Sequence, residues 1–271
     1  MKITDMLFSR GRRSKKTVAA VPAELQQIDG ISADKNYWES LKEQKKLCLV
    51  INMDNTLIDS IDWCNETTYD RNYFTHSSVF DSFKEGKLIP LFYPLEITIK
   101  LRPYIQSFLK DRRSKYHIVL FTKRSPSYLD VINKLLDLDG ANNLTMISLQ
   151  CPKSTHQLKT FLSNQELLVI LDNTKKGWQN KYSRNIIKVD PYAYFSRVKM
   201  NNPFQKSWTE MKGDECELGG ELYRISNLLG GLRNVFYDPR YGDFQDIRQL
   251  IPKFQRKNPL NLYGFSPDVS S

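Results

Sequence analysis

The sequence lacks the features that mark membrane proteins and disulfide-rich secreted proteins. No stretch of its 271 residues approaches the roughly 20 consecutive apolar residues that a transmembrane helix requires. Residues 1–20 lack the apolar block of a secretory signal peptide. The four cysteines are widely spaced and form no Cys-x-x-Cys pair, which argues against a disulfide framework or a zinc site. We therefore expect free thiols in a reducing compartment and no membrane partner.

Internal repeats, low-complexity tracts and helix- or sheet-type nucleic-acid-binding motifs are also missing. Hydrophobic residues make up 40% of the chain and aromatic residues 12%, which is enough for a packed core and excludes wholesale disorder. The net charge of +10 suits an anionic partner such as nucleic acid, a phosphopeptide or an acidic protein. Part of this charge lies in residues 10–16, which are typical either of a nuclear-import or nucleic-acid patch or of a solvated tail.

Apolar segments of strand length alternate with segments of helical spacing along the chain. The expected strands are residues 46–51, 97–101, 117–122, 145–149, 167–171 and 186–189. The expected helices are residues 103–113, with Pro103 in the first turn, then 125–137, 155–163, a helix from about 217 and a second one over 243–254. This alternation predicts an α/β fold whose mostly parallel sheet is flanked by helices, with helical additions at the C-terminal end.

Two regions depart from that alternation. Residues 1–36 are expected to form a basic flexible N-terminal arm with some helix, and residues 37–271 the folded domain. Residues 58–95 are rich in aromatic side chains and irregular, which predicts a hairpin or cap inserted after the first strand. Those aromatics would either line a groove for an extended peptide or pack in the core, and we favour the core for most of them.

The segment over residues 50–57 is the most informative one, because an apolar strand runs there into a polar loop. Two carboxylates two residues apart at a strand end face the same way. An Asp-x-Asp-x-Thr motif would thus supply a nucleophile for phosphorus, a general acid/base and a hydroxyl for phosphate. This chain instead carries Asn52, Asp54 and Thr56. Taken alone, the segment is more typical of a strand that ends in an Asx or Thr turn.

Other predicted strands also end in residues suited to phosphoryl transfer. The strand expected over 117–122 ends at Thr122, and the strand expected over 167–171 is followed by Asp172. Lys159 lies on the helix expected before the latter strand. Each residue alone has an ordinary explanation as a strand-end hydroxyl, a turn residue or a solvated lysine. Carboxyl ends of parallel strands meet at one edge of a sheet, so together with Asp54 they would hold Mg²⁺ and a phosphate.

With these residues in place, the chain resembles the RNA polymerase II C-terminal-domain (CTD) phosphatase family of the haloacid-dehalogenase (HAD) superfamily. The resemblance covers residues 46–256 and is carried by residues 100–104 with 108–109, residues 117–122 with Tyr128, residues 172–173 with Trp178, and residues 185–195. The last stretch, and residues 236–237 and 246–247, are similar to the large transcription-factor-associated subgroup. A BRCT-like domain is not expected to follow.

The resemblance implies a role for seven positions, six of them at or just after predicted strand ends and Lys159 on a predicted helix. The catalytic positions are Asp54 as general acid/base, Asn52 at the nucleophile position and Thr56 as loop support; the phosphate-binding positions are Thr122 and Lys159; the metal positions are Asp172, Asn52, Asn173 and the backbone carbonyl of Asp54. Asn52 departs from the family pattern, because an amide is neutral and a poor nucleophile. Loss of a covalent nucleophile costs on the order of 10⁴ to 10⁶ in rate.

Three functional hypotheses follow. The resemblance implies Mg²⁺ and a phosphoserine or phosphothreonine peptide, such as the RNA polymerase II C-terminal repeat, in the nucleus or otherwise in the cytoplasm. Asn52 favours impaired catalysis, hence a pseudophosphatase. The alternative is an active Mg²⁺-dependent protein serine/threonine phosphatase that uses Asp54 and Asp172, with Asp54 activating water. The third hypothesis is a basic nucleic-acid-associated protein, which rests on charge alone, and nucleic acid is not expected as a direct substrate.

Overall fold

The computed structural model describes residues 30–62, 88–91, 96–136, 144–196 and 206–256. Its centre is a five-stranded sheet in the order β6-β5-β1-β7-β8. The strands are β6 (Thr145–Ser148), β5 (Tyr116–Thr122), β1 (Leu47–Asn52), β7 (Leu168–Asp172) and β8 (Ile186–Lys188). All neighbouring pairs are parallel, so every strand ends at the same edge of the sheet. The predicted mostly parallel α/β fold is confirmed.

Strand β1 lies in the middle of this sheet and is buried along its whole length. Its residue Ile51 pairs with Leu120 of β5 on one side and Leu171 of β7 on the other. Parallel strands covered on both faces need continuous apolar sequence, and each buried side chain of this size contributes roughly 1.5–3 kcal/mol. The central position of β1 brings the residue that ends it, Asn52, between the ends of β5 and β7.

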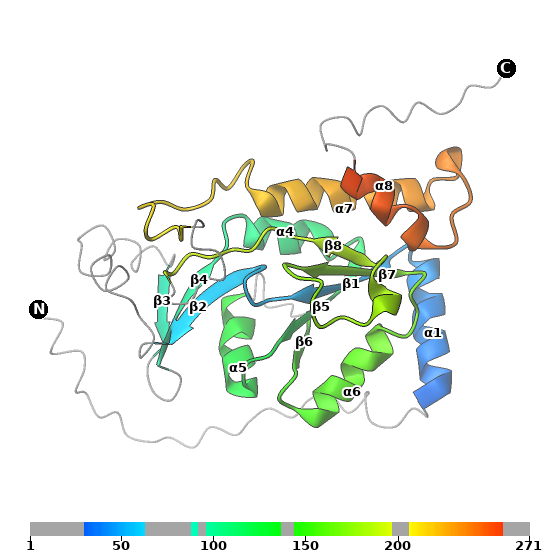
Figure 1. The fold of residues 1–271 in the computed structure, drawn as a ribbon. Helices are drawn as coiled ribbons and strands as arrows, with labels where there is room; N and C mark the ends of the chain where they lie inside the picture. The colour runs from blue at the N-terminus through cyan, green and yellow to red at the C-terminus, as the bar shows by residue number, and fades with distance from the viewer. Residues whose placement is uncertain (1–29, 63–87, 92–95, 137–143, 197–205, 257–271) are drawn as a thin grey trace, which may run out of the picture.

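Helices flank the sheet on both sides. They are α1 (Gly30–Glu43), α4 (Ile105–Arg112), α5 (Pro126–Leu135), α6 (Pro152–Phe161), α7 (Glu221–Tyr237) and α8 (Ile251–Arg256), with short 3₁₀ turns η4 (Asn180–Tyr182), η5 (Pro239–Tyr241) and η6 (Ile247–Gln249). Figure 1 shows α4 and α7 side by side on one side of the sheet, whereas α5 and α6 pack against β6. Trp38 and Leu41 of α1 join the core.

Two helix predictions need correction. The single helix expected over 243–254 is wrong, because Asp246 caps a separate 3₁₀ turn and Ile247 donates its N–H to the carbonyl of Glu166. The apolar spacing there is shared by η6 and α8, which are two short elements. Helix α4 begins at Ile105, two residues beyond the first turn expected at Pro103, since Tyr104 has a left-handed φ of 70°.

A second, smaller sheet follows the loop after β1. It contains β2 (Ile58–Asp62), β4 (Ile97–Leu101) and β3 (Leu88–Leu91), antiparallel in the order β2-β4-β3. The expected insertion is therefore present as strands. All aromatic residues of the segment 58–95 lie outside the described residues, and so do residues 1–29 of the expected arm. Helix α1 crosses the proposed boundary at residue 36, and the division of the chain there stays a prediction.

Cys48, Cys151 and Cys216 are free, and Cys64 lies outside the described ranges. Within the described part of the chain, no helix combines the length and the apolar composition needed to cross a bilayer.

Asn185 gives a direct test of how β7 and β8 are joined. Its side chain is fully buried, and Nδ2 donates to the carbonyl oxygens of Gln165 and Leu168, each at 2.7 Å. We expect Asn185→Ala to lower the free energy of unfolding by about 2–4 kcal/mol, because one buried and one half-buried carbonyl lose their donor. Urea denaturation measures this, with the exposed Asn180→Ala as a control expected to stay within about 0.5 kcal/mol of wild type. Equal midpoints for the two variants would contradict the expectation.

Candidate active site

A tight loop over residues 53–57 joins the end of β1 to β2. Met53 donates its N–H to the carbonyl of Phe121, which extends the β1–β5 pairing by one residue. The Met53 carbonyl in turn accepts from the N–H groups of Leu57 and Ile58. Asn55 has a left-handed φ of 57°, a conformation that asparagine tolerates better than most residues. The loop thereby turns the Asp54 side chain toward the end of β5.

The Asp54 carboxylate is held by groups at the end of β5. The Thr122 hydroxyl lies 2.9 and 3.0 Å from the two carboxylate oxygens, and the N–H of Lys123 donates to Oδ2 at 3.1 Å. Arg124 donates its backbone N–H to the Thr122 hydroxyl at 3.1 Å. Asp54 is half-buried and Thr122 fully buried, so one carboxylate face is fixed against β5. This is the geometry of an oriented general acid or base.

The side chain of Asn52 joins Asp54 to Asp172. Its Nδ2 donates to Asp172 Oδ1 at 3.1 Å, while its Oδ1 accepts from the Asp54 N–H at 3.3 Å. Asp172 also accepts from the Thr174 N–H at 3.0 Å and from Trp178 Nε1 at 2.7 Å. Asn52 and Asp172 are both buried. Burial in a low-dielectric setting is costly for the Asp172 carboxylate, and the three N–H donors offset that cost.

Asn173 holds the loop after β1 in place through Asp54 and Thr56. Asn173 Nδ2 donates to the backbone carbonyl of Asp54 at 2.7 Å and lies 3.4 Å from the Thr56 hydroxyl. The fully buried Arg102 donates Nη1 to the carbonyls of Thr56 and Asp190, and it pairs with Glu215. The structure thus brings Asn52, Asp54, Thr56, Thr122, Asp172 and Asn173 to one edge of the sheet.

Lys159 is the predicted site residue that the structure does not bring there. Helix α6 starts at Pro152, just after the carboxyl end of β6, and runs back along the sheet. Lys159 is exposed in the last turn of α6, about 10 Å along the helix axis from its start. Its interpretation as a lysine that binds phosphate beside Thr122 stays a prediction, because the spacing along the chain gives the helix but not its direction.

Sequence reasoning missed several groups that complete the site. Two are backbone donors, the N–H groups of Lys123 and Thr174, which no side-chain pattern reveals. Trp178 was part of a recognised motif, but its contact with Asp172 was not anticipated. Arg124 lies at the rim, with Nη1 3.1 Å from Asp62 and its guanidinium 5.3 Å above the ring of Tyr128.

Tyr128 lies beneath this arginine and close to the site. It is buried, and its N–H is capped by the Ser125 hydroxyl at the start of α5. Burial raises the pKa of the Tyr128 phenol, and the nearby Asp54 carboxylate raises it further. The phenol therefore stays protonated at neutral pH.

The residues that the resemblance assigns to Mg²⁺ do not fit that ion as they are arranged. Mg²⁺ needs oxygen ligands in near-octahedral geometry. Asn52 and Asn173 instead direct their NH₂ groups at the oxygens of Asp172 and Asp54 that would face the ion. Among the described residues, no group of three or more His, Cys, Asp or Glu side chains is placed to hold a metal.

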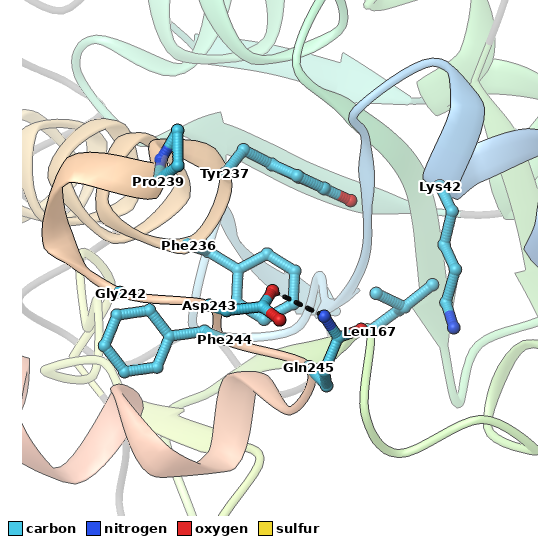
Figure 2. Close-up of a pocket in the computed structure, with 9 residues that line it drawn as sticks. All are labelled: Lys42, Leu167, Phe236, Tyr237, Pro239, Gly242, Asp243, Phe244 and Gln245. Carbon is cyan, nitrogen blue, oxygen red and sulfur yellow. Dashed lines mark hydrogen bonds between the residues drawn. The ribbon is translucent and has the colours of Figure 1, made fainter.

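A hollow of about 310 Å³ lies at the opposite, amino-terminal edge of the sheet, next to Leu167 at the start of β7 (Figure 2). Its walls combine the rings of Phe236, Tyr237 and Phe244 with Lys42 of α1. Asp243 and Gln245 on its border are joined by a 2.6 Å hydrogen bond. This hollow lacks the strand-end hydroxyl and backbone donors of the Asp54 site, so it is not the candidate active site.

The parallel sheet with its strand-end cluster matches the HAD-like architecture expected from the sequence. The sequence profile of the NIF family, the NLI interacting factor-like phosphatases, matches residues 47–212, which is more than half of the chain. The chain therefore belongs to the NLI interacting factor-like phosphatase family.

Two curated relatives carry related names. RNA polymerase II C-terminal domain phosphatase-like 4 of Arabidopsis thaliana is 29% identical over 205 residues, which cover 73% of this chain and 46% of that protein. An RNA polymerase II C-terminal domain phosphatase of Encephalitozoon cuniculi is 24% identical over 220 residues, which cover 79% of this chain and 49% of that protein. The chain spans about half the length of these relatives.

A solved structure agrees with the fold. The structure of Fcp1, described as an essential RNA polymerase II CTD phosphatase, matches with a TM-score of 0.56 and 16% sequence identity. The match covers 82% of this chain and 73% of that one. At this identity the likeness shows the fold alone, and it confirms the expected HAD-like architecture.

Proposed function

We propose that this chain is a CTD-phosphatase-like module that binds phosphoserine or phosphothreonine peptides and hydrolyses them poorly or not at all. The observation that carries the proposal is Asn52, which ends the central strand and donates its amide to Asp172, whereas the Asp54–Thr122 pair is retained. An amide does not attack phosphorus at a useful rate, and removing a covalent nucleophile costs on the order of 10⁴ to 10⁶ in rate.

The substrate class is supported by the relatives and by charge. The curated relatives are named as RNA polymerase II C-terminal domain phosphatases, so we propose a phosphorylated C-terminal repeat as the partner. The net charge of +10 favours an anionic peptide. Phosphate would meet the Thr122 hydroxyl and the N–H groups that follow β5. A nuclear location follows from this partner and from the basic segment over residues 10–16.

The alternative is an active Mg²⁺-dependent protein serine/threonine phosphatase. It is favoured by the orientation of Asp54, whose carboxylate is held by Thr122 and Lys123 as a general base would be. Asp54 would then deprotonate a water for direct attack on phosphorus, and Asp172 would have to contribute to the binding of Mg²⁺. The two functions differ in turnover, not in the class of peptide bound.

Peptide binding tests the proposal. A fluorescent C-terminal-repeat peptide should bind at least tenfold more tightly when phosphorylated than when unmodified, measured by anisotropy at physiological salt. Thr122→Val keeps the shape of the side chain but removes a hydroxyl beside the phosphate position, and we expect it to weaken binding of the phosphorylated peptide about tenfold.

Thr160→Val on α6 provides the matched control, because Thr160 lies near the end of that helix and away from the site. It should bind the phosphorylated peptide as wild type does. Equal affinity for the two peptides would refute a phosphopeptide-binding function. Hydrolysis of an aryl phosphate by wild type as fast as by Asn52→Asp would refute the pseudophosphatase and leave the active phosphatase.

A further inference from the structure

The orientation of the Asn52 amide is fixed by what lies on each side of it. The Asp54 backbone N–H is a donor, so it requires the amide oxygen, which lies 3.3 Å away. The Asp172 carboxylate is an acceptor, so it requires the amide NH₂, with Nδ2 at 3.1 Å. A flipped amide would place two donors together and two acceptors together, and both contacts would be lost.

Asn173 is oriented by the same logic. In the structure Nδ2 of Asn173 donates to the Asp54 carbonyl at 2.7 Å, as a carbonyl that only accepts requires when no cation lies between them. Asp172 Oδ1 and the Asp54 carbonyl are therefore each satisfied by an amide N–H. Each amide supplies a partial positive charge where a metal ion would supply a full one.

Aspartate at position 52 would remove the amide donor that satisfies Asp172 Oδ1. One of its oxygens would keep the Asp54 N–H, and the other would lie where Nδ2 is now, about 3 Å from Asp172 Oδ1. Two buried carboxylate oxygens at that separation repel each other and need a proton or a cation between them. The Nδ2 group of Asn52 therefore removes the need for a cation between positions 52 and 172.

We infer that the Asn52 amide takes the place of a divalent cation, so that this chain holds its site together and binds phosphopeptide without Mg²⁺. The Asn52–Asp172 hydrogen bond ties the end of β1 to the loop over residues 172–178, which Asp172 also holds through Thr174 and Trp178. The part of this inference that concerns peptide rests on the proposed function, whereas the part that concerns the metal does not.

Thermal unfolding and calorimetry test the metal part on the full chain. Wild type should unfold at the same temperature in EDTA and in millimolar MgCl₂, with ionic strength matched by NaCl. In EDTA, Asn52→Asp should unfold several degrees below wild type. In MgCl₂ its unfolding temperature should rise again toward that of wild type, because Mg²⁺ binds only its folded state. Calorimetry should show Mg²⁺ binding at least tenfold tighter for Asn52→Asp than for wild type.

The double variant Asn52→Asp/Asp172→Asn is the matched control, because it keeps a single carboxylate in the pair. It should not gain Mg²⁺ affinity. Stabilisation of wild type by MgCl₂ as large as that of Asn52→Asp would overturn the inference, and so would an Asn52→Asp variant that folds but ignores Mg²⁺. Should Asn52→Asp fail to fold in both buffers, the response of wild type alone decides.

Peptide binding in the two buffers separates the inference from the proposed function. Phosphopeptide binding by wild type that is equal in EDTA and in MgCl₂ supports both. Binding in MgCl₂ alone overturns the inference and keeps the proposed function. Absence of binding in both buffers refutes the proposed function, while the unfolding measurements still decide whether Asn52 replaces the cation.

Discussion

Asn52→Asp should raise the Mg²⁺-dependent hydrolysis of an aryl phosphate by at least about 10⁴-fold over wild type. The substitution places an anionic oxygen at the end of β1, the position from which a HAD-like nucleophile attacks. Asp54 is already held by Thr122 and Lys123, and in its proposed role it would protonate the leaving oxygen and then activate water. Steady-state release of nitrophenol from p-nitrophenyl phosphate measures the gain.

Two control variants make this result specific to position 52. Asn52→Ala should stay at the wild-type background, because it removes the amide without supplying a nucleophile. Adding Asp54→Asn to Asn52→Asp should abolish most of the gain, since the acid/base would be lost. A folded, Mg²⁺-loaded Asn52→Asp protein without any increase in rate would show that position 52 is not the nucleophile position.

Asp59→Ala should destabilise the fold strongly, by about 4 kcal/mol or more. Asp59 of β2 is 1% exposed, and its carboxylate accepts four hydrogen bonds, from Asn55 Nδ2 and from the N–H groups of Ser60, Tyr194 and Phe195. Without it, the backbone N–H groups of Ser60, Tyr194 and Phe195 remain buried and lose an acceptor. The midpoint of urea-induced unfolding, followed by circular dichroism, measures the loss.

Asp62→Ala provides the control on the same strand. Asp62 is paired with Arg124 at the surface, its side chain is 45% exposed, and exposed pairs contribute about 0–1 kcal/mol. We therefore expect a midpoint close to that of wild type. If Asp59→Ala and Asp62→Ala unfolded at the same urea concentration, the buried carboxylate would not be what holds residues 194–195 against β2.

The parallel sheet was predictable from the sequence because its strands are covered on both faces. The run over residues 47–51 has to be apolar throughout, since every side chain of β1 is buried, and such a run stands out without any other information. The helix expected over 243–254 was wrong for the opposite reason. Ile247, Leu250, Ile251 and Phe254 are all buried and have helical spacing, but a backbone bond to Glu166 interrupts them.

The candidate site was predictable only where strands end. Asp54, Thr122 and Asp172 follow buried strands, and parallel pairing brings strand ends together. The role of Lys159 stays a prediction, because its distance along the chain from β7 does not tell which end of α6 it occupies. The hydrogen bonds of Lys123 and Thr174 involve backbone N–H groups, which depend on loop conformation and leave no mark in side-chain patterns.

The parallel pairing of β1 with β5 and β7 also has a consequence for the order of folding. The pairs that build the site join residues far apart along the chain, with a separation of 68 positions for Asp54 and Thr122 and of 120 for Asn52 and Asp172. Contacts of such separation form late and slowly, because a long loop must close before they contribute. A chain emerging from the ribosome therefore cannot form the Asn52–Asp172 hydrogen bond until β7 has been made and has docked. A fragment that stops before residue 168 would contain Asp54 and Thr122 but lack Asp172, so the hydrogen bond that joins the ends of β1 and β7 could not form.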